Sequence, residues 1–416
     1  MSHTSTQSLK EDLLHESKIR VEFVVLMAAL TSVMALSIDA ILPAFKMIGS
    51  DLKLLDPNHI QYLISVLFFG FGVGLIIFGP ISDTMGRKKP IYYGGIIFLI
   101  GTLIAYFSES LNIMLVGRFF QGFGAASFRI MAITIIRDEY SGKTMAKVMS
   151  FITTVFILVP IVAPSIGQAI LFLAPWRSIF LFYLITCSVT ISWFALRQRE
   201  TLPEGERKKF SWSNLKSSFK ETLTHPTSLF CILIVGLMRG GMVAYLSCSQ
   251  QIFQGVYEVG EKFPLYFGSL ALTIGLSNIL NSRLLAYFGV GQLVKFALLI
   301  LTFVLVPVTV YLYLGSVATP TLLSFMFLFG CFFGCLGLLF GNLTTMALDP
   351  LGHIAGSASS VVGFTQNLIS VIIGMLISQQ FDQTVRPVTT GLALISFFSL
   401  ALFYIAIKNQ YIKLKS

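Results

Sequence analysis

Four charged side chains lie inside long apolar segments of this 416-residue sequence, where a charge is costly and needs a specific reason. They are Asp39, Arg118, Arg129 and Arg239. A carboxylate in such surroundings can bind and release a proton, and an arginine can pair with a carboxylate or hold an anion. One acid against three bases predicts a positively charged interior, which favours an organic anion over a cationic drug as the ligand.

The positions of these residues predict how they are grouped. Asp39 lies seven residues before the expected outer end of its segment, and Arg118 lies seven residues after the outer start of another. At about 1.5 Å per residue both are roughly 10 Å below the same surface, so we expect them to pair or to line one cavity. Arg129 follows Arg118 by eleven residues, which returns it to the same helix face, towards a central water-filled cavity. The small residues expected on or near that face are Gly122, Ala125 and Ala126.

Alternatives remain for these residues and for the amides in the apolar segments. Asp39 can form a structural ion pair, and Arg239 can bind a backbone carbonyl. The amides that we regard as candidates for the binding cavity are Gln121, Gln250, Gln251, Asn278, Asn281, Asn342, Gln366 and Asn367. For each of them a hydrogen bond between helices is at least as good an interpretation as a ligand contact.

The elements that must position these residues are membrane-spanning helices. Hydrophobic residues make up 55% of the chain and charged residues 12%, against about 25% charged in soluble proteins. This composition excludes a soluble enzyme, a disordered protein and a barrel of alternating strands. A span needs about 20 apolar residues, so we expect an all-α membrane protein with twelve transmembrane helices. The apolar runs lie near 21–46, 59–81, 91–108, 111–136, 146–172, 178–196, 228–251, 264–286, 292–315, 319–346, 355–378 and 388–407.

Basic residues indicate the orientation and the domain organisation. Most of the 29 Lys and Arg fall inside if the N-terminus is cytoplasmic, which predicts that both termini are cytoplasmic. The one long polar stretch in the interior of the sequence separates the sixth run from the seventh, and an even division into six and six is typical of secondary transporters. The domains expected are a tail (1–20), a six-helix half (21–196), a basic cytoplasmic linker (197–225), a second six-helix half (226–407) and a tail (408–416).

The remaining chemistry points away from an enzyme. No Ser/His/Asp, Cys/His or metal-binding constellation is visible, so neither catalysis nor a cofactor or metal is expected. The net charge of +10 does not indicate a nucleic-acid partner, because the basic residues lie between apolar runs. The expected partners are a lipid bilayer, protons and a small-molecule substrate, and we expect a monomer.

The loop between the second and third runs reads G-P-I-S-D-T-M-G-R-K-K, from Gly79 to Lys89. It resembles the G-x-x-x-D-x-x-G-R-[RK] signature of the major facilitator superfamily. The residues that match the signature are Gly79, Asp83, Gly86, Arg87 and Lys88. The resemblance implies a gate that latches the outward-facing state rather than a ligand site. Gly86 is expected to permit a tight turn and Asp83 to pair with a neighbouring helix end.

Two further segments narrow the resemblance. Leu115–Ala126 is similar to the superfamily signature L-x-x-x-R-x-x-Q-G-x-G-A-A, which is characteristic of proton-coupled members, with Arg118 and Gln121 at matching positions. Ser37–Phe45 is similar to the D-x-Y-L-P-A segment of bicyclomycin-resistance-type drug:proton antiporters, the Bcr/CflA branch, with Ile41 in place of the usual Tyr.

Two features depart from that branch. The fifth run ends in P-I-V-A-P-S-I-G-Q instead of the antiporter pattern G-P-x-x-G-G, and Pro160, Pro164 and Gly167 are still expected to kink or tighten this helix. Arg129 and Arg239 are charges that a typical multidrug member is not expected to carry.

The resemblance implies alternating access, with two halves rocking about a site at the middle of the membrane. We expect a proton-coupled exporter of a small organic molecule in the inner membrane of a bacterium, with Asp39 carrying the proton and the substrate near Arg129 and Arg239. A cell interior that is negative drives an anion outward by about 2.3 kcal/mol per charge per 100 mV, so polycarboxylates, including a siderophore of the citrate type, fit export. The alternatives are a multidrug exporter of lipophilic or cationic drugs, a proton-coupled nutrient importer, and a membrane sensor that transports nothing.

Overall fold

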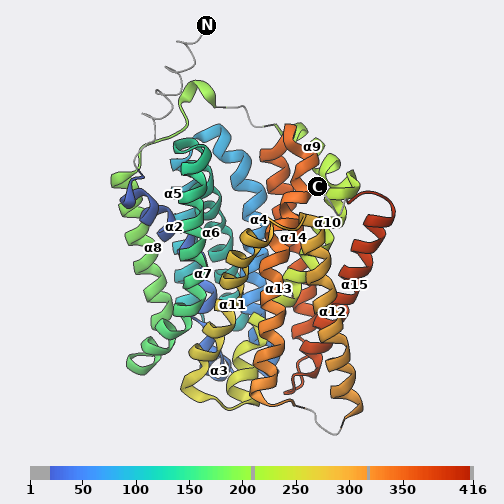
Figure 1. Cartoon of the computed structure of the whole chain (residues 1–416). Helices are drawn as coiled ribbons and strands as arrows, with labels where there is room; N and C mark the ends of the chain where they lie inside the picture. Colours follow the sequence, from blue (N-terminus) through green and yellow to red (C-terminus); the bar gives the residue numbers. More distant parts are fainter. Residues whose placement is uncertain (1–18, 208–210, 316–318, 413–416) are drawn as a thin grey trace.

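The computed structural model describes residues 19–207, 211–315 and 319–412. These residues form long helices that run side by side in one bundle (Figure 1). The N-terminal half consists of α2 (Val21–Asp39), α3 (Phe45–Asp51), α4 (Tyr62–Met85), α5 (Lys88–Tyr106), α6 (Leu111–Glu139), α7 (Gly142–Leu173) and α8 (Arg177–Arg197). The C-terminal half consists of α10 (Pro226–Gln250), α11 (Phe263–Leu284), α12 (Val290–Leu314), α13 (Leu322–Leu348), α14 (Ala355–Ser378) and α15 (Arg386–Lys408).

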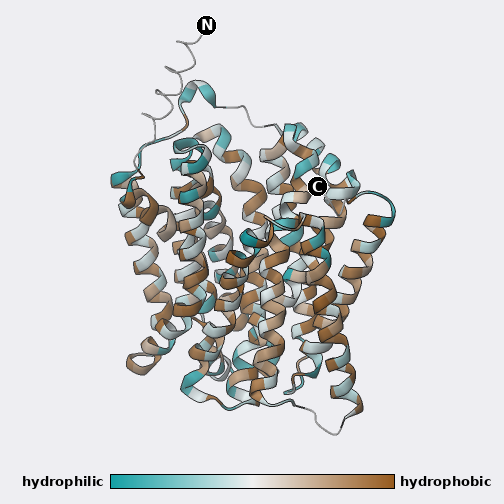
Figure 2. Cartoon of the chain, viewed as in Figure 1, coloured by the Kyte–Doolittle hydropathy of each residue, from teal (hydrophilic) through white to brown (hydrophobic). Residues whose placement is uncertain are grey.

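Apolar composition explains the bundle. Eleven helical stretches of the described residues are long and apolar enough to cross a membrane. One of them, Leu322–Ser378, contains both α13 and α14, joined by the short helix η6 (Asp349–Ile354), so the twelve expected spans are confirmed. The first span continues from α2 through η1 (Leu42–Ala44) into α3. Figure 2 shows that hydrophilic residues gather towards the two ends of the bundle, where backbone and side chains meet water.

Close approach of backbones holds neighbouring helices together. A side chain at Gly74 of α4 would meet the carbonyl oxygen of Phe123 at 2.6 Å and the Cβ of Ala126 at 2.5 Å, both on α6. Only a glycine at this position lets the two helices approach so closely. Close van der Waals packing of this kind is a main contribution to helix association in lipid. The small residues Gly122 and Ala126 therefore fill the contact between α4 and α6 and do not line a cavity, contrary to our expectation.

The loop between the halves marks one end of the bundle, which we call the linker end; we call the other the opposite end. The expected polar linker 197–225 contains a helix that the sequence analysis did not predict, α9 (Trp212–Thr224), seen beside α14 in Figure 1. Its first turn is capped by the Ser211 hydroxyl, which accepts from the Asn214 amide at 3.3 Å. Ser218 of α9 lies 2.8 Å from Ser357 of α14, so this part of the linker packs on the C-terminal half.

Candidate functional site

Asp39 is the last residue of α2, and its side chain is buried. The helix ends here because Pro43, the second residue of η1, has no N–H to donate to the Asp39 carbonyl. Among the described residues the Asp39 carboxylate has neither a hydrogen bond nor an ion pair. No partner stabilises the charged form of this carboxyl group in its buried position, so it can take up a proton here and release it where it meets water.

Gly167 of α7 lies against the turn that follows Asp39. A Cβ at this position would collide with the carbonyl group of Ala40, so only glycine lets α7 pack here. Pro160 and Pro164 lie inside α7, which is continuous from Gly142 to Leu173, and the expected kink stays a prediction.

Arg118 of α6 fixes the helices around Asp39. Its Nη1 donates to the Ser37 carbonyl at 2.9 Å and to Gln121 Oε1 at 2.9 Å, and its Nε donates to the Leu63 carbonyl at 3.2 Å. Gln121 in turn donates to the Thr102 hydroxyl at 2.9 Å. Arg118 thus joins α2, α4 and α6, and it lies against the last turn of α2.

This geometry corrects two expectations. No ion pair joins Asp39 to Arg118 among the described residues. Arg118 and Gln121 are fully buried and hydrogen-bonded within the N-terminal half, so they do not line a water-filled cavity. The Nε and Nη1 of Arg118 instead bind acceptors on α2, α4 and α6, and its Nη2 is buried without a partner among the described residues.

Two tyrosines that the sequence analysis missed complete this group. The hydroxyls of Tyr183 on α8 and Tyr245 on α10 are buried and have no hydrogen-bond partner among the described residues. The charge of Asp39 acts on both phenol groups, and that of Arg118 acts on Tyr183. We call Asp39, Arg118, Tyr183 and Tyr245 the buried polar cluster. Because Tyr245 belongs to the C-terminal half, the cluster spans both halves; a tyrosine in an apolar run gives no sequence signal of such a role.

Arg129 and Arg239 lie in different surroundings. The Arg129 guanidinium stacks on the ring of Phe156, 4.8 Å from its centroid, and the Arg239 guanidinium stacks on Phe340 at 5.6 Å. Both arginines are half-buried, and neither has a hydrogen bond or an ion pair within the described part of the chain. The backbone carbonyl that we considered as a partner for Arg239 is therefore not one.

The candidate amides differ in their hydrogen bonding. Asn342 pairs with Asn281 through two hydrogen bonds of 2.9 and 3.3 Å, and Gln250 donates to Gln254 at 2.9 Å, so these bonds lie within the C-terminal half. The Gln366 Nε2 is buried without a partner among the described residues, which leaves it free for a ligand. Asn278 is half-buried and makes no hydrogen bond in the same part of the chain.

Asn367 and Gln251 instead connect the two halves. Asn367 donates to the Phe68 carbonyl of α4. At the opposite end, Gln61 donates to Gln251 Oε1 at 2.6 Å, and Gln251 donates to the Pro57 carbonyl at 3.1 Å. Gln379, at the end of α14, donates to Gln61 Oε1 at 3.2 Å. We call Asn58, Gln61, Gln251 and Gln379 the amide latch.

Loss of the amide latch is expected to open the opposite end. Gln251→Ala removes three hydrogen bonds between the halves, those to Gln61, to the Pro57 carbonyl and to Asn58 Oδ1. At about 1 kcal/mol each, their loss predicts a shift of roughly 100-fold in the balance between closed and open forms. Opening can be measured as a population of longer distances between two spin labels, attached to cysteines that replace the exposed residues Leu55 and Gln380. Gln254→Ala is the matched control, because Gln254 bonds only within its own half. An unchanged distance distribution in Gln251→Ala would contradict the latch.

The signature loop forms a charged cluster at the linker end. Arg87 binds Asp83 at 2.8 Å and Asp138, at the end of α6, at 3.0 Å. Burial works against the charged form of Arg87, but its hydrogen bonds to Asp83 and Asp138 outweigh burial and raise its pKa above the ordinary value. Asp83, near the end of α4, therefore pairs with the side chain of Arg87, the cap residue at the start of α5.

The turn at Gly86 and the position of Gly79 agree with the signature. Gly86 has a φ of 90°, which confirms the tight turn, and a Cβ there would lie 2.6 Å from a carboxylate oxygen of Glu200. A Cβ at Gly79 would lie 2.5 Å from the Ser360 hydroxyl of α14, so the loop begins at a contact between the halves. Its role as a gate stays a prediction.

Glu200, from the start of the linker, caps this loop. Its carboxylate accepts from the backbone amides of Arg87 at 2.7 Å and Lys88 at 3.1 Å, the first residues of α5 and its cap. Lys88 Nζ donates to the Gln198 carbonyl at 2.6 Å. Burial opposes ionisation of Glu200, but the amides of Arg87, Lys88, Leu202 and Thr201 outweigh it and lower its pKa. The sequence analysis missed Glu200 and Asp138, which lie far along the chain from the loop.

Glu200→Gln is expected to lower the unfolding temperature by about 3 °C at pH 7, because it removes the charge from a helix cap. A lowered pKa stabilises the fold above the ordinary carboxyl range, and this contribution disappears as the pH falls through the lowered value. The difference between Glu200→Gln and the unaltered protein should therefore shrink as the pH falls below the ordinary carboxyl range and vanish below the lowered pKa. Thermal unfolding in detergent measures it, with Glu204→Gln as the control. A difference that grows in acid would contradict this assignment.

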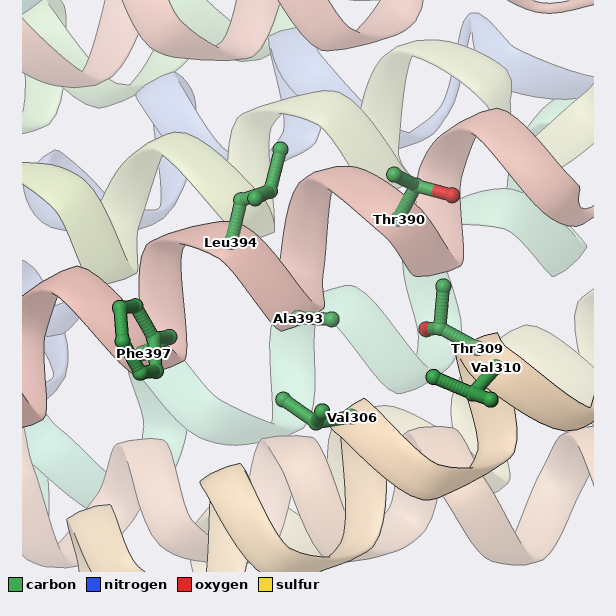
Figure 3. A pocket seen from close by; sticks show the side chains of 7 residues that line it. All are labelled: Val306, Thr309, Val310, Thr390, Ala393, Leu394 and Phe397. Carbon is green, nitrogen blue, oxygen red and sulfur yellow. The ribbon is translucent and has the colours of Figure 1, made fainter.

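A surface pocket between α12 and α15 lies away from these residues (Figure 3). Its lining is almost wholly apolar, and Val310, Leu394 and Phe397 are exposed on the outside of the bundle. Such a groove on a membrane-spanning surface is suited to a lipid chain and offers no group for transport chemistry.

Comparisons with known proteins show which family shares this sequence and fold. Residues 27–375 match the family model described as Major Facilitator Superfamily. An uncharacterized MFS-type transporter, YdgK of Bacillus subtilis, is 29% identical over 92% of this chain and 96% of its own length. A bicyclomycin resistance protein homolog of Haemophilus influenzae is 26% identical over 95% of this chain and 99% of its own length. The crystal structure of a D-xylose-proton symporter aligns with a TM-score of 0.71 at 13% identity, over 91% of this chain and 96% of that one.

Proposed function

The chain belongs to the Major Facilitator Superfamily, and we propose that it exports a small organic molecule across the bacterial inner membrane in exchange for protons. The bicyclomycin-resistance-like resemblance seen in the sequence is confirmed by a relative of that name. The protein is a multi-pass membrane protein of two six-helix halves, and we propose that one copy is sufficient for transport because a single chain supplies both halves.

The observation that carries this proposal is the buried, unpartnered carboxyl group of Asp39. The turn η1, which follows Asp39, packs on α10 of the other half, the helix that carries Tyr245. Adding or removing a proton at Asp39 therefore changes the electrostatic energy of a contact between the halves. A change of this kind can bias rocking between two states, as alternating access requires.

The direction of transport follows from charge and orientation. The excess of basic residues at the linker end supports a cytoplasmic location for that end. With that orientation the amide latch closes the outer end, and a substrate would enter from the cytoplasm. An external proton then reaches Asp39 when the outer end opens, and it leaves on the cytoplasmic side in the other state.

Proton release on adding a ligand tests the proposal. Purified protein in weakly buffered detergent solution is mixed with lipophilic cations and with organic anions, and the pH is followed with a dye. An antiporter is expected to release close to one proton per bound ligand at pH values where Asp39 is protonated. Proton uptake on binding would instead support a symporter, and no change with either ligand class would contradict coupling.

A multidrug exporter is the second candidate. The name of the Haemophilus influenzae relative favours it, since bicyclomycin is a drug. The two uncompensated guanidinium groups of Arg129 and Arg239 oppose it for cations, because like charges repel in a medium of low dielectric constant. Release of protons with cations alone would favour this second candidate.

A further inference from the structure

We propose that the substrate is a small organic anion with a flat apolar body, bound between Arg129 and Arg239. The inference rests on the proposed transport function and specifies its cargo. The two arginines lie on different halves, Arg129 on α6 and Arg239 on α10. The aromatic partners of the two arginines flank the same turn of α11. Ile157, beside Phe156, packs on Gly275 of this turn, and Gly337, one turn before Phe340, packs on its residues Ile274 and Ser277. The charge of Arg129 acts on Arg239 across this short separation.

The contact between α7 and α11, which joins the two halves, lies beside the aromatic partners of both arginines. Ile157, beside Phe156 on α7, packs on Gly275 of α11 in the other half. On α10, Gly240 packs against Ile373 of α14, whereas the adjacent Arg239 points to Phe340 of α13. A ligand that binds both guanidinium groups would therefore touch both halves.

The charge at this place is not compensated. Helices α7, α10 and α13 contain no Asp or Glu, and neither arginine has an ion pair among the described residues. Two like charges that are half-buried near each other repel, and this repulsion is relieved when an anion lies between them. A guanidinium group offers paired N–H donors that match the two oxygens of a carboxylate or sulfonate.

The side chains around Arg129 and Arg239 favour a substrate with an apolar body. Each guanidinium group lies over a phenyl ring, so the walls beside the charges are aromatic faces. A citrate-like trianion would carry one negative charge more than the two arginines can neutralise, so a planar monoanion or dianion fits better.

Binding of 2-naphthoate tests this inference, with 2-naphthamide, 2-naphthylmethylammonium and citrate as comparisons. Isothermal titration of the whole protein in detergent is expected to give the tightest binding with the naphthoate. Arg129→Gln and Arg239→Gln should each raise the Kd for naphthoate at least 10-fold, because a charge-assisted contact is lost. Arg386→Gln is the matched control, since Arg386 also stacks on an aromatic ring, Tyr313, at 5.5 Å, but lies at the opposite end. Its Kd should stay within about twofold of the unaltered value.

The outcomes separate this inference from the transport proposal. Equal or tighter binding of the amide or the ammonium compound to the unaltered protein overturns the inference, and this comparison needs no variant to fold. Tighter binding of citrate than of naphthoate would contradict the claim that the substrate has a flat apolar body. If cations drive proton release that depends on Asp39 while naphthoate does not bind, the inference fails and the transport function stands. If the naphthoate binds as predicted without any proton release, the inference stands and proton coupling fails.

Discussion

Asp39→Asn is expected to abolish proton-driven transport, lowering the exchange rate in liposomes at least 100-fold while the protein stays folded. Asparagine has nearly the shape of aspartate but cannot take up a proton at neutral pH. Asp39 has no ion pair among the described residues, so its replacement leaves no charged partner uncompensated. The unfolding temperature should therefore change little, and ligand binding should persist without the release of a proton.

Glu109→Gln is the control for this prediction. Glu109 lies in the same half, is exposed between α5 and α6, and makes no hydrogen bond among the described residues. The substitution Glu109→Gln removes an exposed carboxylate and leaves the buried polar cluster unchanged, so the rate of exchange should not change. Proton-driven exchange at a normal rate in Asp39→Asn would show that another group carries the proton.

The sequence predicted the fold well because membrane spans depend on local composition. Twelve apolar runs became twelve helices, since a backbone in lipid must satisfy its own hydrogen bonds. Helix α9 was missed because its sequence is polar. The helix is stabilised by the cap at Ser211 and by packing on α14, where the ring centroids of Phe219 and Phe364 are 6.1 Å apart.

The site could be predicted only in part. Charges in apolar runs identified Asp39, Arg129 and Arg239, because their cost in lipid makes them conspicuous in the sequence. Their partners could not be found in this way. Glu200 meets the Arg87 amide across 113 positions of the sequence, and Tyr245 differs from a packing aromatic only by where its hydroxyl lies. Helix periodicity placed Arg118 and Arg129 on one face, but the neighbouring helices bury the first and leave the second half-exposed.

Arg118→Lys is expected to lower the unfolding temperature by at least 5 °C and to reduce exchange at least 10-fold. The guanidinium group reaches three acceptors on three helices, the carbonyls of Ser37 and Leu63 and the Gln121 side chain. An ammonium group keeps the charge but cannot span the same three directions. Each charge-assisted hydrogen bond contributes about 1.5–3 kcal/mol, and a carbonyl left unpaired in this interior adds its own cost.

The comparison with Asp39→Asn separates the two roles. Arg118→Lys should affect stability and transport together, because it loosens the last turn of α2, on which Asp39 is held. Proton release per bound ligand should nevertheless persist, since the carboxyl group remains. Arg137→Lys is a suitable control: Arg137 is exposed near the end of the same helix, α6, and makes no hydrogen bond or ion pair among the described residues. If Arg118→Lys abolished proton release but left the unfolding temperature unchanged, Arg118 would take part in proton transfer itself rather than position Asp39.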